Sequence, residues 1–258
     1  MLRIFKKYAL IPRNMDPIRM HWDVRSTEYN DFVVKGYNDL RERRAWQDHF
    51  SSILGTDPLN ILDVGCGPGI VSMQLADLGH RMTSVDLSDR MVEFAKANSS
   101  ANGLNIDIRQ GNALALQFPD SSFDAVVSDY MLWTVPDPEK VISEWFRVLK
   151  PGCRLAYTDG DWFHDPLSTP FRSRVSAYFA KRDRKGLEEV HEESDTEMEL
   201  WSSDAVRPRD DIRMLEKAGF REIRVIENVQ RKVLHGSRYY AYGFTNNHFT
   251  ITAVKPSE

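Results

Sequence analysis

The stretch that decides the fold is Ile-Leu-Asp-Val-Gly-Cys-Gly-Pro-Gly-Ile at residues 61–70. A short apolar run ends in an acid, Asp63, and glycines follow at positions 65, 67 and 69 before a helical pattern begins. This order predicts a buried strand that turns sharply into a helix. Glycine lets a ligand lie against the backbone, and open α/β sheets bind their ligands at the carboxyl ends of strands. The loop therefore predicts a site for a nucleotide-like cofactor.

Strand and helix patterns alternate around this loop. Strands are expected at residues 59–64, 81–86, 106–109, 123–128 and 153–158, with helices between them at 70–78, 88–102 and 138–149. Such alternation is typical of βαβ units in a parallel sheet. A helix at 209–218 and two antiparallel strands at 222–229 and 249–254 complete the α/β fold, a doubly wound, mostly parallel sheet of seven strands.

The composition bounds the class of protein. The 258 residues, 41% of them hydrophobic, suit one large domain. We expect an N-terminal helical cap over residues 1–50 and a catalytic α/β domain over 51–258, in which 161–208 form a lid-like insertion after the fifth strand. A net charge of −4 argues against a protein built to bind polyanions, so no nucleic acid partner is expected.

Three features predict a cytoplasmic protein with no membrane partner. Cys66 and Cys153 are expected as reduced thiols, because a disulfide in the glycine loop would obstruct a ligand. No apolar run reaches the length of about 18 residues that a transmembrane helix needs. Residues 1–10 are basic and apolar but too short for a signal peptide, and a short packed helix is favoured there over a segment that touches a membrane.

Two acids near the glycine loop indicate which hydrogen-bonding groups the cofactor carries. A dinucleotide fingerprint reads G-x-G-x-x-G and leaves the helix N-terminus to a pyrophosphate, whereas the spacing here is G-x-G-x-G. Asp63 suits a cofactor whose amino group and hydroxyls need hydrogen-bond acceptors. Alternatively, an acid at this position only stabilises the turn by accepting hydrogen bonds from backbone amides. Asp86, which ends the second strand, suits ribose hydroxyls or, alternatively, the N-terminus of the next helix.

Further segments follow in a characteristic order, namely VDLS at 85, GNALALQFPDSSFDAVVS from 111 and EWFRVLKPGCRL from 144. Together with residues 61–70 they resemble the class I S-adenosylmethionine-dependent methyltransferases of the broad small-molecule type. No single segment decides the match, but the ordered set is specific. The resemblance implies a Rossmann-like methyltransferase fold with S-adenosylmethionine as the methyl donor and S-adenosylhomocysteine as the product.

The resemblance also implies residues that bind the cofactor. Asp63 and the loop with Gly65, Cys66, Gly67 and Gly69 are expected to hold the methionine part and the ribose, with Asp86 on the ribose hydroxyls and Leu87 on the adenine. Asn112 stands where the family usually has an acid that accepts the adenine amino group, so that bond lacks charge assistance. The remaining residues implied at the cofactor are Met91, Ala113, Ser128, Tyr130 and Tyr29.

The implied reaction is an in-line methyl transfer, for which the protein mainly has to align the acceptor, the methyl group and the sulfur. A general base is needed only when the acceptor arrives protonated. The sequence does not choose among the candidate bases, which are Tyr130, Asp161 and His164. Residues expected at the acceptor are Asp129, Trp133 and Trp162. No spacing typical of a metal site occurs, so no metal is expected.

The leading hypothesis is a methyltransferase that acts on a small molecule. A methyltransferase for RNA or protein is disfavoured by the acidic insertion and by the lack of an Asn/Asp-Pro-Pro-Tyr/Phe tetrapeptide after the fourth strand. A non-catalytic module that binds S-adenosylmethionine would explain why no base stands out. A nicotinamide dehydrogenase is disfavoured by the glycine spacing. The sequence reveals neither the acceptor atom nor the oligomeric state.

Overall fold

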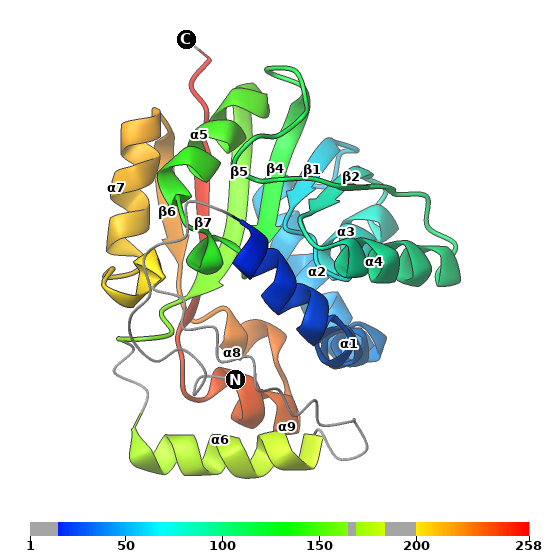
Figure 1. The fold of residues 1–258 in the computed structure, drawn as a ribbon, viewed down its shortest axis with the longest axis vertical. Coiled ribbons are helices and arrows are strands. Elements are labelled where there is room, and N and C mark those ends of the chain that lie inside the picture. The colour runs from blue at the N-terminus through cyan, green and yellow to red at the C-terminus, as the bar shows by residue number, and fades with distance from the viewer. Residues whose placement is uncertain (1–14, 165–168, 184–199, 258) are drawn as a thin grey trace.

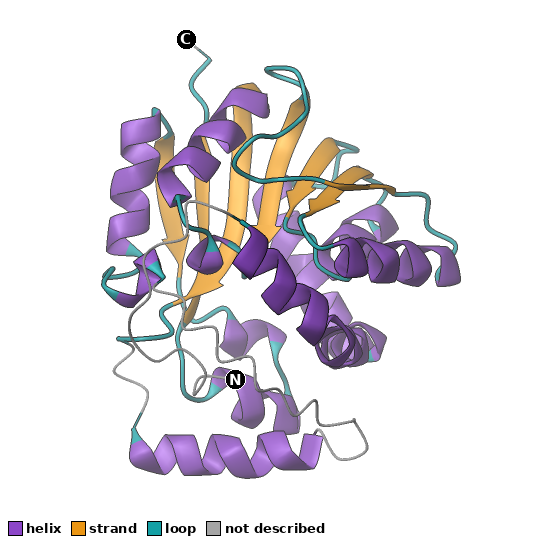
Figure 2. Ribbon diagram, in the orientation of Figure 1, coloured by secondary structure: helices purple, strands orange, loops and turns teal. Residues whose placement is uncertain are grey.

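The computed structural model describes residues 15–164, 169–183 and 200–257. Within these ranges the chain forms a seven-stranded sheet in the order β3-β2-β1-β4-β5-β7-β6, with helices on both faces (Figures 1 and 2). The strands are β1 Asn60–Val64, β2 Arg81–Asp86, β3 Asp107–Gln110, β4 Phe123–Asp129, β5 Leu149–Gly160, β6 Arg221–Ile226 and β7 His248–Val254. The predicted doubly wound, mostly parallel sheet is confirmed.

The strand pairing places the carboxyl ends of the parallel strands at a single edge. Strands β3, β2, β1, β4 and β5 are parallel, and the strand order reverses between β1 and β4. As expected, β7 is antiparallel to β6, and it is also antiparallel to β5. Gly160 pairs with His248, so β7 begins where β5 ends. A point where the strand order reverses is the usual ligand site of an open α/β sheet.

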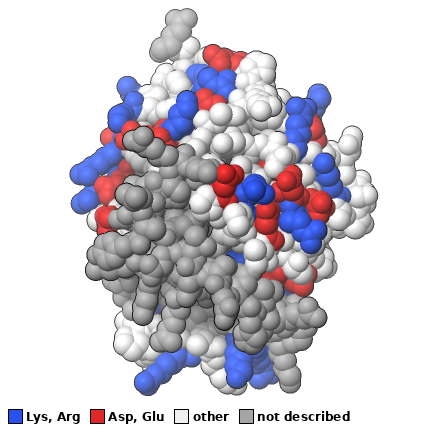
Figure 3. All heavy atoms as spheres, in the orientation of Figure 1, with Lys and Arg blue, Asp and Glu red and all other residues white. Residues whose placement is uncertain are grey.

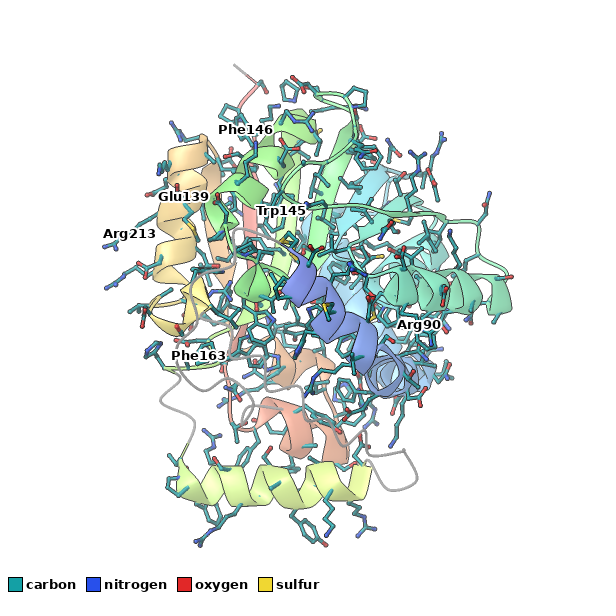
Figure 4. All side chains as sticks on the ribbon, in the orientation of Figure 1. Arg90, Glu139, Trp145, Phe146, Phe163 and Arg213 are labelled. Carbon is teal, nitrogen blue, oxygen red and sulfur yellow. The ribbon has the colours of Figure 1, made fainter. Side chains whose placement is uncertain are left out.

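Helices cover both faces of the sheet. The helices are α1 Asp16–Asn38, α2 Leu40–Leu54, α3 Ile70–Asp77, α4 Asp89–Ala101, α5 Pro138–Val148, α6 Pro170–Asp183, α7 Arg209–Ala218, α8 Gln230–Val233 and α9 Gly236–Arg238. On one face α2, α3 and α8 enclose a cluster that includes Phe50, Leu75 and Val233. On the other face α5 and α7 pack on a larger cluster around Trp145, which is labelled on α5 in Figure 4.

Several helices gather at the carboxyl edge of the sheet. In Figure 1, α8 and α9 lie below the lower ends of the strands, α6 runs beneath them, and α1 crosses in front. The hydroxyl of Ser176 in α6 donates to the carbonyl of Ala241 at 2.6 Å. Arg238 of α9 binds Glu42 of α2 at 2.8 Å and thereby joins the C-terminal segment to the N-terminal helices. We call α1, α6, α8, α9 and the π-helical segment Tyr239–Gly243 the cover.

Most expected elements lie within a few residues of their predicted bounds, and two findings differ. Strand β5 begins at Leu149 rather than at 153, and helix α6 was not expected, because it buries none of its residues and carries no clear apolar stripe. The domain boundary predicted at residue 50 falls inside α2, so that division stays a prediction, as does the lid role of 161–208. Residues 1–10 and the acidic run 188–199 lie outside the described residues.

Figure 3 shows both signs of charge mixed over the visible face, with Lys and Arg at the lower end, where α6 exposes Arg174, Lys181 and Arg182. No described helix combines the length and the apolar character that a membrane span requires.

Candidate active site

The glycine loop between β1 and α3 forms the floor of the candidate site. Gly65, Gly67 and Gly69 have positive φ angles of 73°, 51° and 84°, which residues with side chains rarely adopt. The amides of Gly65 and Cys66 donate to the carbonyl of Val85 at 2.8 and 3.0 Å, which holds the loop against the end of β2. The loop therefore has a fixed shape and can bring its backbone close to a ligand.

Asp86, the last residue of β2, binds the loop with one oxygen and the start of α4 with the other. Oδ2 accepts the amide of Gly67 at 2.8 Å, and Oδ1 accepts the amide of Ser88 at 2.9 Å. Burial raises the pKa of Asp86 to about 6, although these amides act in the opposite direction. Each carboxylate oxygen keeps a further lone pair, so Asp86 can still accept hydrogen bonds from the hydroxyls of a ligand.

Asp63, near the end of β1, is a buried acid with no cationic partner in the part of the chain that the structure describes. Its Oδ2 accepts the hydroxyl of Ser72 at 2.5 Å, whereas Oδ1 is buried and has no hydrogen-bond partner among the described residues. Burial raises the pKa of Asp63 to about 7; the hydrogen bond from Ser72 opposes this rise, and the nearby Asp86 adds to it. A cation beside Asp63 would stabilise its charged form, so the site favours a positively charged ligand.

A cavity of about 960 Å³ extends from the glycine loop into the space under the cover. The predicted site residues that line it are Asp63, Gly65, Cys66, Gly67, Asp86, Leu87, Met91, Ala113, Asp129, Tyr130, Trp133, Trp162 and Tyr29. They come from α1, α4 and the glycine loop, from the ends of β1, β2 and β4, and from the segments that follow β2, β3, β4 and β5. The volume is at the upper end of the roughly 300–1,000 Å³ typical of ligand sites, so it suits two small ligands side by side.

Tyr29 of α1 closes one side of the glycine loop. A Cβ atom added at Gly67 would lie 3.5 Å from Cε1 of Tyr29, which places the ring in contact distance of the loop. Burial raises the pKa of Tyr29, and the carboxylates of Asp129 and Asp86 raise it further. The N-terminal helix thus supplies a wall of the cavity, in a position that favours the predicted contact of Tyr29 with the cofactor.

Four rings form an aromatic wall, which we define as Tyr130, Trp133, Trp162 and His248; all four line the cavity. The hydroxyl of Tyr130 lies 2.7 Å from Nδ1 of His248. The ring centre of Trp162 is 5.8 Å from that of Tyr130, 5.1 Å from that of His248 and 5.8 Å from that of Trp133. Such a wall is suited to a flat, apolar ligand.

A buried ion pair holds the aromatic wall in place. Asp159 accepts the amide of Trp133 at 3.1 Å and the indole N–H of Trp162 at 3.3 Å. Arg207 lies 3.0 Å from Asp159 and 2.6 Å from Asp211, and all three side chains are almost fully buried. Burial raises the pKa of Asp159, and Arg207 opposes that rise. Arg207 offsets part of the negative charge of the two acids, so Asp159 can orient both tryptophans from inside the protein.

Some predicted residues lie outside the cavity wall, namely Gly69, Asn112, Ser128, Asp161 and His164. Ser128 donates to the carbonyl of Val64 at 2.7 Å, and Asn112 accepts the amide of Leu114 at 2.9 Å. Asp161 accepts the amide of His164 at 2.9 Å, and the His164 side chain is exposed. The roles expected of these five residues stay predictions, and the positions of the residues do not support those roles.

Several polar residues of the cavity were not predicted, and His248 and Arg238 are two of them. His248 begins β7, and only the antiparallel register with β5 brings it beside Tyr130. Arg238 lines the cavity from α9, where Glu42 at 2.8 Å compensates its charge. Both lie in or next to the long connection between β6 and β7, whose aromatic and polar composition was the sequence signal available there.

Comparisons with known proteins agree with this architecture. Residues 62–157 match the family described as methyltransferase domain. The chain is 30% identical to a demethylmenaquinone methyltransferase of Renibacterium salmoninarum, over 67% of this chain and 70% of that protein. It is 34% identical to a ubiquinone biosynthesis O-methyltransferase of Pseudomonas fluorescens, over 53% of this chain and 56% of that protein. The chain thus spans little more than half the length of this second relative.

A solved structure extends the comparison to the fold. An S-adenosylmethionine-dependent methyltransferase of Methanosarcina mazei superposes with a TM-score of 0.55 at 27% identity, over 78% of this chain and 94% of that one. With the motif order and the sheet topology, these likenesses settle the class. This chain belongs to the class I S-adenosylmethionine-dependent methyltransferases.

The residues present fit the cofactor of this family. The glycine loop leaves room for a ligand against its backbone, and Asp86 has acceptor capacity for hydroxyls. The buried Oδ1 atoms of Asp63 and Asp129 lack hydrogen-bond partners in the described part of the chain, and both residues line the cavity. A sulfonium compound with an ammonium group would bring the positive charge that these carboxyls lack.

Proposed function

We propose that the chain transfers a methyl group from S-adenosylmethionine to a small, apolar acceptor that contains a ring. The observation that carries this proposal is the continuity of the cavity, which joins the glycine loop and Asp86 to the aromatic wall. Its volume suits a cofactor and an acceptor together. The acceptor then lies against Trp133 and Trp162, with its nucleophilic atom toward the methyl group.

In this proposal the acids of the site bind the cofactor. Asp86 accepts the ribose hydroxyls, and Asp63 and Asp129 face the positively charged methionine part. The bound cofactor supplies an already activated methyl group, so the chain has to align the reactants and exclude water. Alignment of this kind is worth roughly 7–11 kcal/mol of the activation barrier. The aromatic wall, fixed by Asp159, supports such alignment because its rings are held in place.

The size of the acceptor is inferred from the cavity and from the relatives. The two relatives are named for demethylmenaquinone and for ubiquinone biosynthesis, which favours a small ring compound here as well. An RNA or protein acceptor is less favoured because the acceptor end lies under the cover. A non-catalytic binding module is less favoured because the cavity extends beyond the cofactor residues. A cytoplasmic location is supported by the free thiols of Cys66 and Cys153.

Two measurements test the proposal. Calorimetry with S-adenosylhomocysteine should show binding that Asp86→Ala weakens at least tenfold, because two hydrogen bonds to a charged group are lost, each worth about 1.5–3 kcal/mol. The matched control is Asp107→Ala, which removes an exposed acid on the neighbouring strand, paired with Arg109, and should leave the affinity unchanged. Label from the methyl donor should then pass to small phenols, quinols or amines. An absence of binding to wild-type protein would falsify the proposed function.

A further inference from the structure

The contact between Tyr130 and His248 has no part in the cofactor binding proposed above. It lies at the acceptor end of the cavity, with 2.7 Å between the hydroxyl of Tyr130 and Nδ1 of His248. Tyr130 is held in the left-handed region, with φ at 52°, and its amide donates to the carbonyl of Thr158 at 2.8 Å. A conformation of this kind costs of order 1–3 kcal/mol in a residue with a side chain and tends to occur at functional sites.

The surroundings fix the protonation states of the pair. Burial lowers the pKa of His248 to about 4, while the backbone carbonyl of Tyr242 acts in the opposite direction. Burial also raises the pKa of Tyr130, and the charged and titratable groups that raise it further are Asp129, Tyr29, Asp159 and Glu42. At neutral pH the phenol therefore keeps its proton and the imidazole is uncharged. The phenol can then donate its proton to the lone pair on Nδ1.

The other neighbours of His248 leave this arrangement undisturbed. Gln230 of α8 accepts the backbone amide of His248 at 3.0 Å, and Trp162 meets its ring at an interplanar angle of 65°. Nε2 is buried and makes no hydrogen bond to a described residue. Nδ1 faces the hydroxyl of Tyr130, so donation by the phenol needs the tautomer that carries its proton on Nε2.

We propose that Tyr130 and His248 form a proton relay, and that the acceptor atom is a hydroxyl oxygen of a phenol or an enol. This inference rests on the proposed function. A lone pair of the acceptor oxygen forms the new bond to the methyl carbon, and the electron pair of the carbon–sulfur bond stays on sulfur as a neutral thioether. The acceptor proton passes to Oη of Tyr130 as the Tyr130 proton passes to Nδ1 of His248, which leaves an imidazolium.

The chemistry of the acceptor explains why a relay is needed. A thiolate, a carboxylate or a neutral amine offers a free lone pair, whereas a hydroxyl must lose its proton. As the carbon–oxygen bond forms, the hydroxyl proton becomes far more acidic than an imidazolium. A buried histidine of low basicity can therefore take it, and such a base remains uncharged and ready across neutral pH. General-base assistance of this kind is worth about 10²–10⁴-fold in rate.

The first test needs no acceptor. Nuclear magnetic resonance of the full chain labelled with ¹⁵N-histidine and bound to S-adenosylhomocysteine reports the tautomer of each ring, and His248→Gln assigns the signal. We expect a neutral ring with its proton on Nε2 between pH 6 and 8, and a displaced Nδ1 signal in Tyr130→Phe. A proton on Nδ1, or a cationic ring at pH 7, would overturn the relay.

The second test is the pH profile of single-turnover methylation of 4-methylphenol at saturating S-adenosylmethionine. Wild-type protein should react at a rate that is constant from pH 6 to 8. In Tyr130→Phe and His248→Gln only the ionised phenol reacts, so the rate should fall about 100-fold or more and rise about tenfold per pH unit. A rate that stays constant with pH in His248→Gln contradicts the relay. So does a constant rate that is lost in Asp129→Asn but kept in Tyr130→Phe and His248→Gln.

A matched control and a panel of acceptors separate the possible failures. His49→Gln removes another buried histidine, whose pKa burial also lowers to about 4 and which binds Thr250 outside the cavity, so this variant should keep the flat profile. Transfer to 4-methylaniline or 4-methylthiophenol but not to 4-methylphenol would refute the acceptor class and leave the methyltransferase proposal intact. Failure of S-adenosylhomocysteine to bind would instead remove the proposed function itself.

Discussion

Replacing Asp63 by asparagine should remove most of the pH dependence of cofactor binding. The carboxyl is buried, its Oδ1 has no hydrogen-bond partner among the described residues, and its pKa is raised to about 7. A cationic ligand beside it needs the ionised form, so binding must drive a proton off any molecule in which Asp63 is protonated. The raised pKa therefore predicts that S-adenosylmethionine binds more weakly in acid than in mild base.

The size of this effect follows from the two pKa values in the site. With a pKa of about 7, roughly one molecule in eleven carries the Asp63 carboxylate at pH 6 and nearly all do at pH 8, so the affinity should differ about tenfold. Asp86, with a pKa of about 6, adds a factor of about two over the same interval. Asp63→Asn should keep only that smaller factor.

Calorimetry at pH 6, 7 and 8, in buffers of different ionisation enthalpy, measures both the affinity and the number of protons released. Wild-type protein should release about 1.4 protons at pH 6, about 0.9 from Asp63 and about 0.5 from Asp86, and Asp63→Asn should release only about 0.5. Asp107→Ala is the control, because that acid is exposed and paired with Arg109. The reasoning fails if the wild-type affinity is constant from pH 6 to 8, or if Asp63→Asn keeps the full dependence.

Three further predictions concern stability, each read from urea unfolding. Arg207→Met leaves Asp159 and Asp211 buried without their cationic partner and should lower the unfolding free energy by about 3–5 kcal/mol; a loss below 1 kcal/mol contradicts a stabilising role of Arg207. Gly69→Ala should cost more than Gly79→Ala, since both have positive φ but only the first meets a neighbour at 3.1 Å; equal losses argue against this. Ser88→Ala removes the cap of α4 and should cost about 1 kcal/mol, and no change would show that the cap is unimportant.

The central part of the fold could be predicted from the sequence because its signals are local. The glycine loop, the acid that ends β2 and the cap at Ser88 each depend on a few consecutive residues. Helix α7 and its stop at Gly219 follow from a strong amphipathic pattern in the same way. Most residues predicted at the cofactor therefore line the cavity, and their roles there stay predictions.

Only part of the acceptor end could be predicted, because several of its contacts join distant segments. His248 meets Tyr130 across 118 positions, and Arg238 meets Glu42 across 196. Helix α6 lacks a buried face, so no periodicity marks it. His164 was only a weak candidate base, because a lone loop histidine is more often solvated. The structure leaves it exposed, and the antiparallel strand β7 supplies a histidine of the cavity instead.

The division of the cavity wall between the sheet edge and the cover has an evolutionary consequence. The residues proposed to face the methyl donor belong mainly to the sheet edge and its loops, whereas α6, α9 and the π-helical segment Tyr239–Gly243 belong to segments that run outside the sheet. Substitutions in those outer segments can alter which compound is modified while the donor's pocket stays intact. Related chains can thus diversify their chemistry by exchanging a peripheral module, and libraries confined to 170–183 and 236–246 are the natural place to redirect this enzyme.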